Sequence, residues 1–335
     1  MSKQIKILLV LMVAAAAIYV LVIRKPLRSY SGDGTDFAIE DTGSITKFFV
    51  ANARNEKVLL TKQPDGNWMV DNKVYADLNK VNLLLQTMHD IKMRNPLGEN
   101  QYNTVIKDLT AAGIKVEFYE GDDLIKTIYV GQATLDQSGT FMMIDGAKTP
   151  FVTHIQGFVG YLTPRFPTNP VKWKTKLIFD EDANNIANIS VSYPITPQQS
   201  FTIDNTSASP VLKDGEGNAV QADVNFIKFY VASFKQLYTE AYDDNFTATQ
   251  HDSIANGDAY CVIKLTDKGG KVQSLKLHIK GIDLKTKSRY DDTGTELTFD
   301  TDKYFGFVNN DNNMMYIQSY SFGRVLKKLS DFKKK

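Results

Sequence analysis

The longest apolar pattern in the chain is an unbroken run of 17 residues, Ile7 to Ile23, with Lys6 before it and Arg24 after it. As a helix, this run would reach roughly 25 Å at 1.5 Å per residue. The long side chains of the flanking basic residues can make up the difference to a hydrocarbon core of ~30 Å. The pattern predicts that residues 1–28 form an N-terminal transmembrane helix in contact with the lipid bilayer.

The same segment predicts where the rest of the chain lies. Apolar residues 18–23 continue beyond the small residues Ala14 to Ala17, whereas a signal peptidase site has small residues in a polar context. We therefore expect an uncleaved signal anchor, with a cleaved signal peptide as the alternative. Both flanks are basic and do not set the orientation. Because no later segment could cross again, we expect a single-pass protein of the bacterial inner membrane with its C-terminal body in the periplasm.

Two amphipathic helices are predicted by one spacing that occurs twice, 146 residues apart. After Asp77 and again after Asp223, apolar residues follow at intervals of i, i+3, i+4, i+7 and i+10. They are Val81, Leu84, Leu85, Met88 and Ile91 in the first segment, and Ile227, Tyr230, Val231, Phe234 and Leu237 in the second. Each Asp suits a helix N-cap, worth about 1 kcal/mol, better than it suits a catalytic pair. The repetition predicts two copies of one unit.

Alternating apolar segments that end at turn signals flank both helices in the same order. In the first copy they are residues 45–50, 57–61, 68–70, 114–118, 124–130, 140–144 and 151–154; in the second they are 186–192, 201–203, 261–265, 272–279, 304–308 and 315–318. This order predicts an α+β fold with two tandem antiparallel-sheet units, each with one packed amphipathic helix. The second copy has extra residues around 285–302. A longer surface loop costs little free energy, because the entropy of loop closure rises slowly with loop length.

These patterns give a predicted domain organisation. Residues 1–28 are the signal anchor, 29–44 a linker, 45–165 the first α+β repeat, 166–183 an inter-repeat linker, 184–330 the second repeat and 331–335 a basic tail. The inter-repeat linker has a strand-like segment at 176–179, so we expect it to pack rather than swing freely.

Charge is spread unevenly along the chain, which has 39 Lys and Arg, 38 Asp and Glu and a net charge of +1. Residues 1–28 hold five basic residues and 327–335 hold another five. Asp331 is the only acid in either segment, so the stretch 29–326 is net −8. Phosphate backbones repel such an acidic body, and we therefore expect no nucleic acid partner. The single cysteine excludes a disulfide framework, a four-thiolate zinc site and a CxxC redox centre.

Catalytic signatures are missing from the sequence: the GxSxG nucleophile elbow, the P-loop and GxGxxG all lack a usable match. The histidines, which are His89, His154, His251 and His278, lack zinc-site spacing. His89 is expected to be partly buried beside Met88. Adjacent acids fall in predicted turns and linkers, where Asp bonds the local backbone; they are Asp122-Asp123, residues 180–182, Asp243-Asp244 and Asp291-Asp292. We assign no catalytic, cofactor-binding or metal-binding residue.

Three smaller features have both a functional and a structural interpretation. Arg165 could clamp an anion between the units, but pairing with a linker acid such as Asp180 is the preferred interpretation. Asp214 to Asn218 alternates acids with glycines but lacks the EF-hand register, and it is interpreted as a turn. Cys261 lies among alternating apolar residues and is interpreted as a strand residue.

Several segments carry a resemblance to a known family. At the two Ala-Asp helix starts, at residues 113–117 and at the run His154 to Leu162, the chain resembles a bacterial family, domain of unknown function 4340. The resemblance covers residues 37–165 well and 184–326 weakly, and in the second copy Asp214 stands in the place of Trp68. It implies a membrane-tethered extracytoplasmic protein, often encoded near ABC-type transport components of the gliding-motility-like class. It implies no catalytic or binding residues.

Two functional hypotheses follow, from different classes. The first is a non-enzymatic accessory or interaction subunit of an ABC-type, gliding-motility-like transport complex. The alternative is a cell-envelope glycan-binding protein or hydrolase with its site between the two repeats. A third possibility is a spacer in which one unit holds the other away from the bilayer.

Overall fold

The computed structural model describes residues 34–309 and 311–333, which divide into two compact units between Lys174 and Thr175. The predicted anchor, Ile7 to Ile23, lies outside the described residues. Within the described ranges, no helix is both long enough and apolar enough to cross a membrane.

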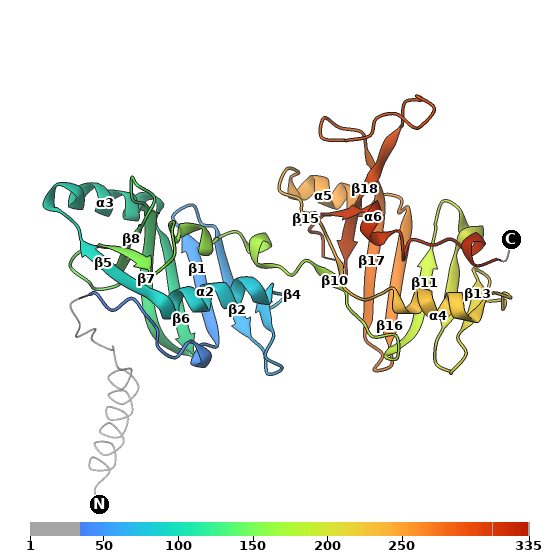
Figure 1. The fold of residues 1–335 in the computed structure, drawn as a ribbon, viewed down its shortest axis with the longest axis horizontal. Coiled ribbons are helices and arrows are strands. Elements are labelled where there is room, and N and C mark those ends of the chain that lie inside the picture. Colours follow the sequence, from blue (N-terminus) through green and yellow to red (C-terminus); the bar gives the residue numbers. More distant parts are fainter. Residues whose placement is uncertain (1–33, 310, 334–335) are drawn as a thin grey trace, which may run out of the picture. The chain divides into compact units, whose positions relative to one another are not determined.

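The first unit is built on an antiparallel sheet whose strands lie in the order β4-β3-β2-β1-β6-β7-β8-β9-β5 (Figure 1). The strands are β1 (Lys47–Asn52), β2 (Lys57–Lys62), β3 (Trp68–Val70), β4 (Val74–Tyr75), β5 (Ile91–Pro96), β6 (Ile114–Glu120), β7 (Asp123–Ala133), β8 (Thr140–Ile144) and β9 (Phe151–Ile155). Short 3-10 turns lie at Thr42–Ser44, Thr163–Arg165 and Pro170–Trp173. All the expected strands of this unit are present.

Helix α2 (Leu78–Asp90) lies across this sheet (Figure 1) and begins at the predicted N-cap, because the Asp77 carboxylate accepts the backbone N–H of Asn79 at 3.0 Å. Its stripe of Val81, Leu84 and Met88 is fully buried. The predicted stripe extended to Ile91, but Ile91 is extended and begins strand β5. The chain therefore passes directly from the helix to the edge of the sheet.

The predicted inter-repeat linker contributes to the first core. Trp173 is buried and lies 5.4 Å from Phe48, ring centroid to ring centroid, while its Nε1 donates to the Pro167 carbonyl at 2.7 Å. Phe48 also packs on Trp68 at 5.2 Å. Residues 166–173 thus form part of the first unit, as the expectation of a packed linker requires.

A second helix in the first unit, α3 (Glu99–Ala112), was not predicted. It packs against β7 with Val105 and Leu109 buried. The two residues form a narrow stripe among polar neighbours, and the N-cap residue Gly98 makes no side-chain capping bond. A short stripe without a capping signal gives little sequence evidence for a helix. The expectation of one helix per unit is therefore wrong.

The second unit has an antiparallel sheet in the order β13-β12-β11-β16-β17-β18-β19-β15. The strands are β11 (Ile186–Ser192), β12 (Phe201–Asp204), β13 (Val211–Asp214), β15 (Ala241–Tyr242), β16 (Cys261–Asp267), β17 (Val272–Gly281), β18 (Phe299–Val308) and β19 (Met315–Gln318), with a separate pair of β10 (Leu177–Phe179) and β14 (Leu237–Tyr238). The helices are α4 (Val224–Ala232), α5 (Ala248–Ala255) and α6 (Ser319–Phe322), with 3-10 turns at Pro197–Gln199 and Leu329–Phe332.

The two sheets have the same strand order when their strands are matched in sequence. The first sheet begins with four strands and the second with three that lie in the order opposite to the sequence, so β4 has no counterpart. Each sheet continues through four strands that follow one another in sequence and ends at an edge strand, β5 or β15. The predicted class, antiparallel sheets with packed helices, is confirmed at this level. Asp223 caps α4 as predicted, although α4 ends at Ala232 and Leu237 lies in a strand.

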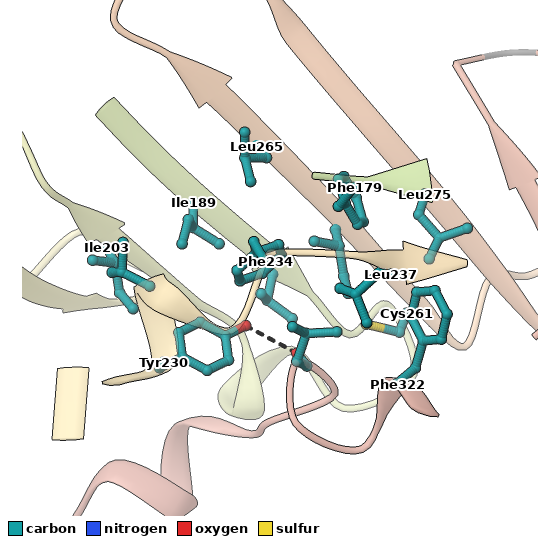
Figure 2. Packing of buried hydrophobic residues seen from close by; sticks show 14 of the residues in the cluster. Phe179, Ile189, Ile203, Tyr230, Phe234, Leu237, Cys261, Leu265, Leu275 and Phe322 are labelled. Carbon is teal, nitrogen blue, oxygen red and sulfur yellow. Dashed lines mark hydrogen bonds between the residues drawn. The ribbon is translucent and has the colours of Figure 1, made fainter. Parts of the chain in front are cut away.

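Aromatic residues of α4 and of the turn that follows it lie in the second core (Figure 2). The Tyr230 hydroxyl donates to the Val325 carbonyl at 2.9 Å, and Phe234 packs 5.5 Å from Phe179. Cys261 is a buried strand residue, as predicted, and burial raises the pKa of its thiol to about 12. Phe332, expected in a basic tail, is buried 4.9 Å from Phe201 and belongs to this core.

The extra residues of the second unit form an arm, residues 282–298, that joins β17 to β18 and projects beyond them in Figure 1. A buried ion pair lies at its base, where Lys280 Nζ is 2.9 Å from Asp300 Oδ2. Lys280 also reaches the Asp283 carboxylate at 2.9 Å and the Thr286 hydroxyl at 3.3 Å. The base of the arm is therefore fixed by buried polar contacts.

Candidate functional site

The four histidines lie on separate elements. His89 is at the exposed end of α2, with Nδ1 2.7 Å from Asp90, so the prediction of partial burial is wrong. The imidazole lies one residue past the buried stripe and points to solvent. His154 lies in β9, His251 in α5 and His278 in β17. In the described part of the chain, no group of three or more His, Cys, Asp or Glu residues could hold a metal ion.

Most of the paired acids act in local structure, as predicted. Asp291 accepts backbone N–H groups of Thr293 and Thr295 in the turn at the end of the arm, at 2.9 Å each. Asp214 accepts those of Glu216 and Asn218 in the same way. These carboxylates are used by turns and lie apart from one another.

Asp243 is the exception, because it gathers groups from three elements around a carboxylate with no exposed surface. Its Oδ1 accepts the Tyr316 hydroxyl at 2.6 Å, and its Oδ2 accepts His251 Nε2 at 2.9 Å and the backbone N–H of Phe246 at 2.8 Å. Asn245 donates to both oxygens. The sequence interpretation placed Asp243 in a turn and gave no sign of the other two side chains.

The charge state of this cluster follows from its hydrogen bonds. Burial acts to raise the pKa of Asp243, but the bonds from Tyr316, His251, Phe246 and Asn245 outweigh it and lower the pKa to about 2. Burial and the neighbouring carboxylate raise the pKa of Tyr316. Both Asp243 oxygens are occupied by protein donors, so the group orients His251 and fixes the start of α5 rather than taking a proton from a substrate.

A second feature is the exposed loop 156–161, which we call the Phe158 loop. Val159 is 94% exposed, and Phe158 and Tyr161 are also exposed. The loop turns at Gly157 (φ +81°) and Gly160 (φ +139°), values that favour glycine. A Cβ on Gly160 would also lie 3.2 Å from the Phe158 ring. The loop is part of the run His154 to Leu162 that carries the family resemblance.

Arg165 holds this loop in place. Its guanidinium lies 4.3 Å from the centre of the Phe158 ring, a cation–π contact, and its NH1 nitrogen donates to Thr87 Oγ1 of α2 at 2.8 Å. Asp180, the acid with which Arg165 was predicted to pair, belongs to the second unit, where it accepts the backbone N–H of Gln236 and lies 3.9 Å from Lys235 Nζ. Local sequence could not show that Arg165 returns to α2.

The residues around the Phe158 loop are basic. Lys92 of β5 reaches Gln156 Oε1 at 3.5 Å, at the start of the loop, and Arg165 lies against Phe158. Asp90, the acid that interacts with Lys92, already accepts Gln86 Nε2 at 2.6 Å and contacts His89. The loop is thus an apolar surface held by the Arg165 contact, with cationic flanks.

An open cavity of about 340 Å³, lined mostly by exposed residues, lies elsewhere in the first unit, between β5, α3 and the turn that joins β7 to β8. It is lined by Arg94, Asn95, Gln101, Thr134, Leu135, Asp136, Ser138, Phe141 and Val152. The sequence analysis singled out none of these residues, because the cavity joins segments that are up to 58 residues apart.

One comparison with known proteins gave a match. The model of a family described as a domain of unknown function, DUF4340, matches residues 37–253, more than half of the chain. The match covers the described first unit from Phe37 and continues into α5 of the second. No curated protein and no solved structure was found to be similar to the chain.

Proposed function

The chain belongs to the DUF4340 family of domains of unknown function, and from that premise we propose that it is a non-enzymatic interaction subunit of an ABC-type, gliding-motility-like transport complex. In this proposal Ile7 to Ile23 holds the chain in the bacterial inner membrane and the body lies in the periplasm. The two units are tandem copies of one ancestral unit. Their common strand order and the equivalent Asp77 and Asp223 caps support this duplication.

The Phe158 loop is the observation that carries the proposal. A large aliphatic or aromatic side chain exposed on a rigid surface marks an interaction site more often than one on a mobile segment does, because little conformational entropy is lost on binding. Here two glycines and the Arg165 contact hold Phe158, Val159 and Tyr161 outward.

The surroundings of the loop define the chemistry of the partner. An apolar centre flanked by Lys92 and Arg165 is complementary to an apolar segment flanked by acidic residues. We assign this segment to an extracytoplasmic part of an ABC-type transport component. The net charge of −8 over residues 29–326 speaks against nucleic acid as the partner.

The test uses the full chain in its own membrane. A photo-crosslinking amino acid at Val159 is expected to capture an ABC-type component, identified by mass spectrometry. The same amino acid at Ile195, which is also exposed but lies in the second unit, is the matched control and should not capture it. Val159→Asp should abolish co-purification of that component after gentle detergent extraction, whereas Ile195→Asp should not.

Two results would overturn the proposal. One is an anchored protein that purifies alone from both wild-type and Ile195→Asp cells. The other is capture of only lipid or non-transport proteins at position 159. Recovery of the chain in the cytosolic fraction would overturn its membrane placement separately.

A further inference from the structure

The cavity between β5, α3 and the β7–β8 turn has a fixed polar lining. Asp136 accepts the hydroxyls of Thr134 and Ser138 at 2.5 Å each and the backbone N–H of Ser138 at 3.2 Å. The NH1 nitrogen of Arg94 donates to Ser138 Oγ at 2.6 Å and to the Ser138 carbonyl at 3.5 Å. Ser138 therefore links a guanidinium and a carboxylate in one ordered network.

The charges of this network cancel. The hydroxyl of Ser138, with that of Thr134, lowers the pKa of Asp136 to about 2, so the carboxylate is ionised at neutral pH. Arg94 carries the opposite charge beside it. A site with one positive and one negative group has no net attraction for a phosphate or for a metal ion, and a single carboxylate is too few ligands for calcium. The lining is compatible with an uncharged polar molecule.

Hydrogen-bonding capacity remains for such a molecule. Among the described residues, the side-chain amides of Asn95 and Gln101 have no hydrogen-bond partner, and only one of the three guanidinium nitrogens of Arg94 is used. These groups together offer both donors and acceptors. Val152 and the half-buried ring of Phe141 add an apolar surface to the same cavity.

We propose that this cavity binds an uncharged saccharide unit. Sugar hydroxyls both donate and accept hydrogen bonds, which matches the amides and the Arg94–Asp136 network, and the C–H face of a sugar ring can pack on Phe141. The volume of about 340 Å³ falls within the roughly 300–1,000 Å³ of small-molecule pockets. The proposal is independent of the interaction surface at the Phe158 loop.

An extended peptide fits the cavity less well, although it too is uncharged and polar. Peptides commonly add a strand to an exposed sheet edge, and β5 is the edge strand here. The register of β5 is interrupted between Met93 and Asn95, and Pro96 has no N–H to donate. Both features oppose strand addition at the place where the cavity lies.

The experiment is saturation-transfer NMR on the full chain in lipid nanodiscs, because glycoside detergents would present a sugar themselves. The probes are maltotriose and the trisaccharide of N-acetylglucosamine, with trigalacturonic acid as the charged counterpart and a neutral polar pentapeptide as the rival ligand. Wild-type protein is expected to bind at least one neutral trisaccharide, and Arg94→Ala or Gln101→Ala should weaken that binding at least tenfold. Arg54→Ala, another exposed arginine of the first unit, is the matched control and should bind as wild type does.

Each alternative result overturns the proposal. The first such result is that neither neutral trisaccharide binds. The second is that trigalacturonic acid or the pentapeptide binds more tightly than both neutral trisaccharides. The third is that Arg94→Ala and Gln101→Ala bind the neutral trisaccharide as tightly as Arg54→Ala does. Because Arg94 and Gln101 are exposed, all three variants should unfold at the wild-type denaturant midpoint, and this check separates lost binding from lost folding.

Discussion

Asp77 and Asp223 cap their helices with the same geometry, although they lie 146 residues apart in the sequence. Both have a φ of −72°, and each carboxylate accepts the backbone N–H of the residue two positions later, Asn79 at 3.0 Å and Asn225 at 2.8 Å. An N-cap of this kind satisfies a backbone N–H that has no partner within the helix. The two caps therefore stabilise corresponding helices in the two units.

Removal of either cap should destabilise only its own unit. We expect Asp77→Ala or Asp223→Ala to lower the free energy of unfolding by about 1 kcal/mol. Asp77→Asn and Asp223→Asn should retain most of the stabilisation that the cap provides. Both tryptophans of the chain, Trp68 and Trp173, are buried in the first core. Tryptophan fluorescence in a urea titration should therefore shift for Asp77→Ala but not for Asp223→Ala, while circular dichroism should report both. A fluorescence shift caused by Asp223→Ala would contradict the independence of the caps.

Local patterns were enough to predict most of the fold. Alternation predicted most of the strands, with β3, β8, β11 and β19 placed at their observed ends, and the repeated spacing predicted α2 and α4. It did not predict β14 or the edge strands β4, β5, β13 and β15. Helix α3 was missed because its stripe is short and its N-cap is a glycine. Leu237 fitted the period of a helix but lies in β14, where pairing with β10 outweighs the helical spacing. Pairing between distant strands is not encoded in local periodicity.

The candidate sites could not be predicted in this way, because each is assembled from distant residues. Asp243 meets Tyr316, which is 73 positions later, and Arg165 meets Thr87, which is 78 positions earlier. The sequence placed Asp243 in a turn and Arg165 at the end of the first repeat, and neither description included these partners. A signal was present only for the Phe158 loop, since it lies in the run that carries the family resemblance.

The buried pair at the base of the arm gives a prediction on stability. Lys280→Met alone leaves the buried Asp300 carboxylate without its cation and should lower the free energy of unfolding by about 3–5 kcal/mol. Asp300→Leu alone should cost less, because Lys280 keeps Asp283 as a partner. The double variant removes both charges and should recover most of this loss. The exposed pair of Lys47 and Asp122 is the control, and Asp122→Leu should cost at most about 1 kcal/mol.

The same variants should change the accessibility of the arm. When the ion pair at the base of the arm is removed, the arm should unfold locally more often. Trypsin should then cleave faster at Lys285, Lys287 and Arg289, all of which are exposed. Gel electrophoresis of a timed digest measures this directly. An unchanged cleavage rate in Asp300→Leu would show that the arm is held by other contacts.

From the hydrogen bonds of Asp243 we expect the folded chain to lose stability in acid. Its pKa is about 2 in the folded chain, whereas an unfolded Asp titrates near ~3.9. The unfolded state therefore binds the proton first, and the stabilising contribution is present above pH ~4 and is lost as the pH falls toward 2. Urea unfolding followed by circular dichroism at pH 5, 4 and 3 measures this effect. The free energy of unfolding of Asp243→Asn should be lower than that of the wild type at pH 5 and should decrease less between pH 5 and pH 3. Asp292→Asn, an exposed control, should follow the wild type.

From the environment of His278 we expect a second decrease in stability, at a higher pH than that caused by Asp243. Burial lowers the pKa of its imidazole, although the bond from Nδ1 to the Asp258 carbonyl, 3.1 Å long, opposes the shift. Because a carbonyl only accepts, Nδ1 carries the proton, and Nε2 remains a buried acceptor without a partner among the described residues. Phe307 packs edge-on to the ring, and the charge of Lys276, whose Nζ donates to the Ala255 carbonyl, further disfavours a second proton.

The sign of the effect follows from these contacts. As the pH falls below about 6.5, the unfolded histidine takes up a proton while the folded one stays neutral, so the free energy of unfolding decreases. One proton gives a slope of at most about 1.4 kcal/mol per pH unit, and the decline ends below the folded pKa. In urea titrations followed by circular dichroism, His278→Gln should remove this decrease in the free energy of unfolding between pH 7 and pH 5. His89→Gln, which changes an exposed imidazole, should retain it, and an identical slope in both variants would mean that another group titrates.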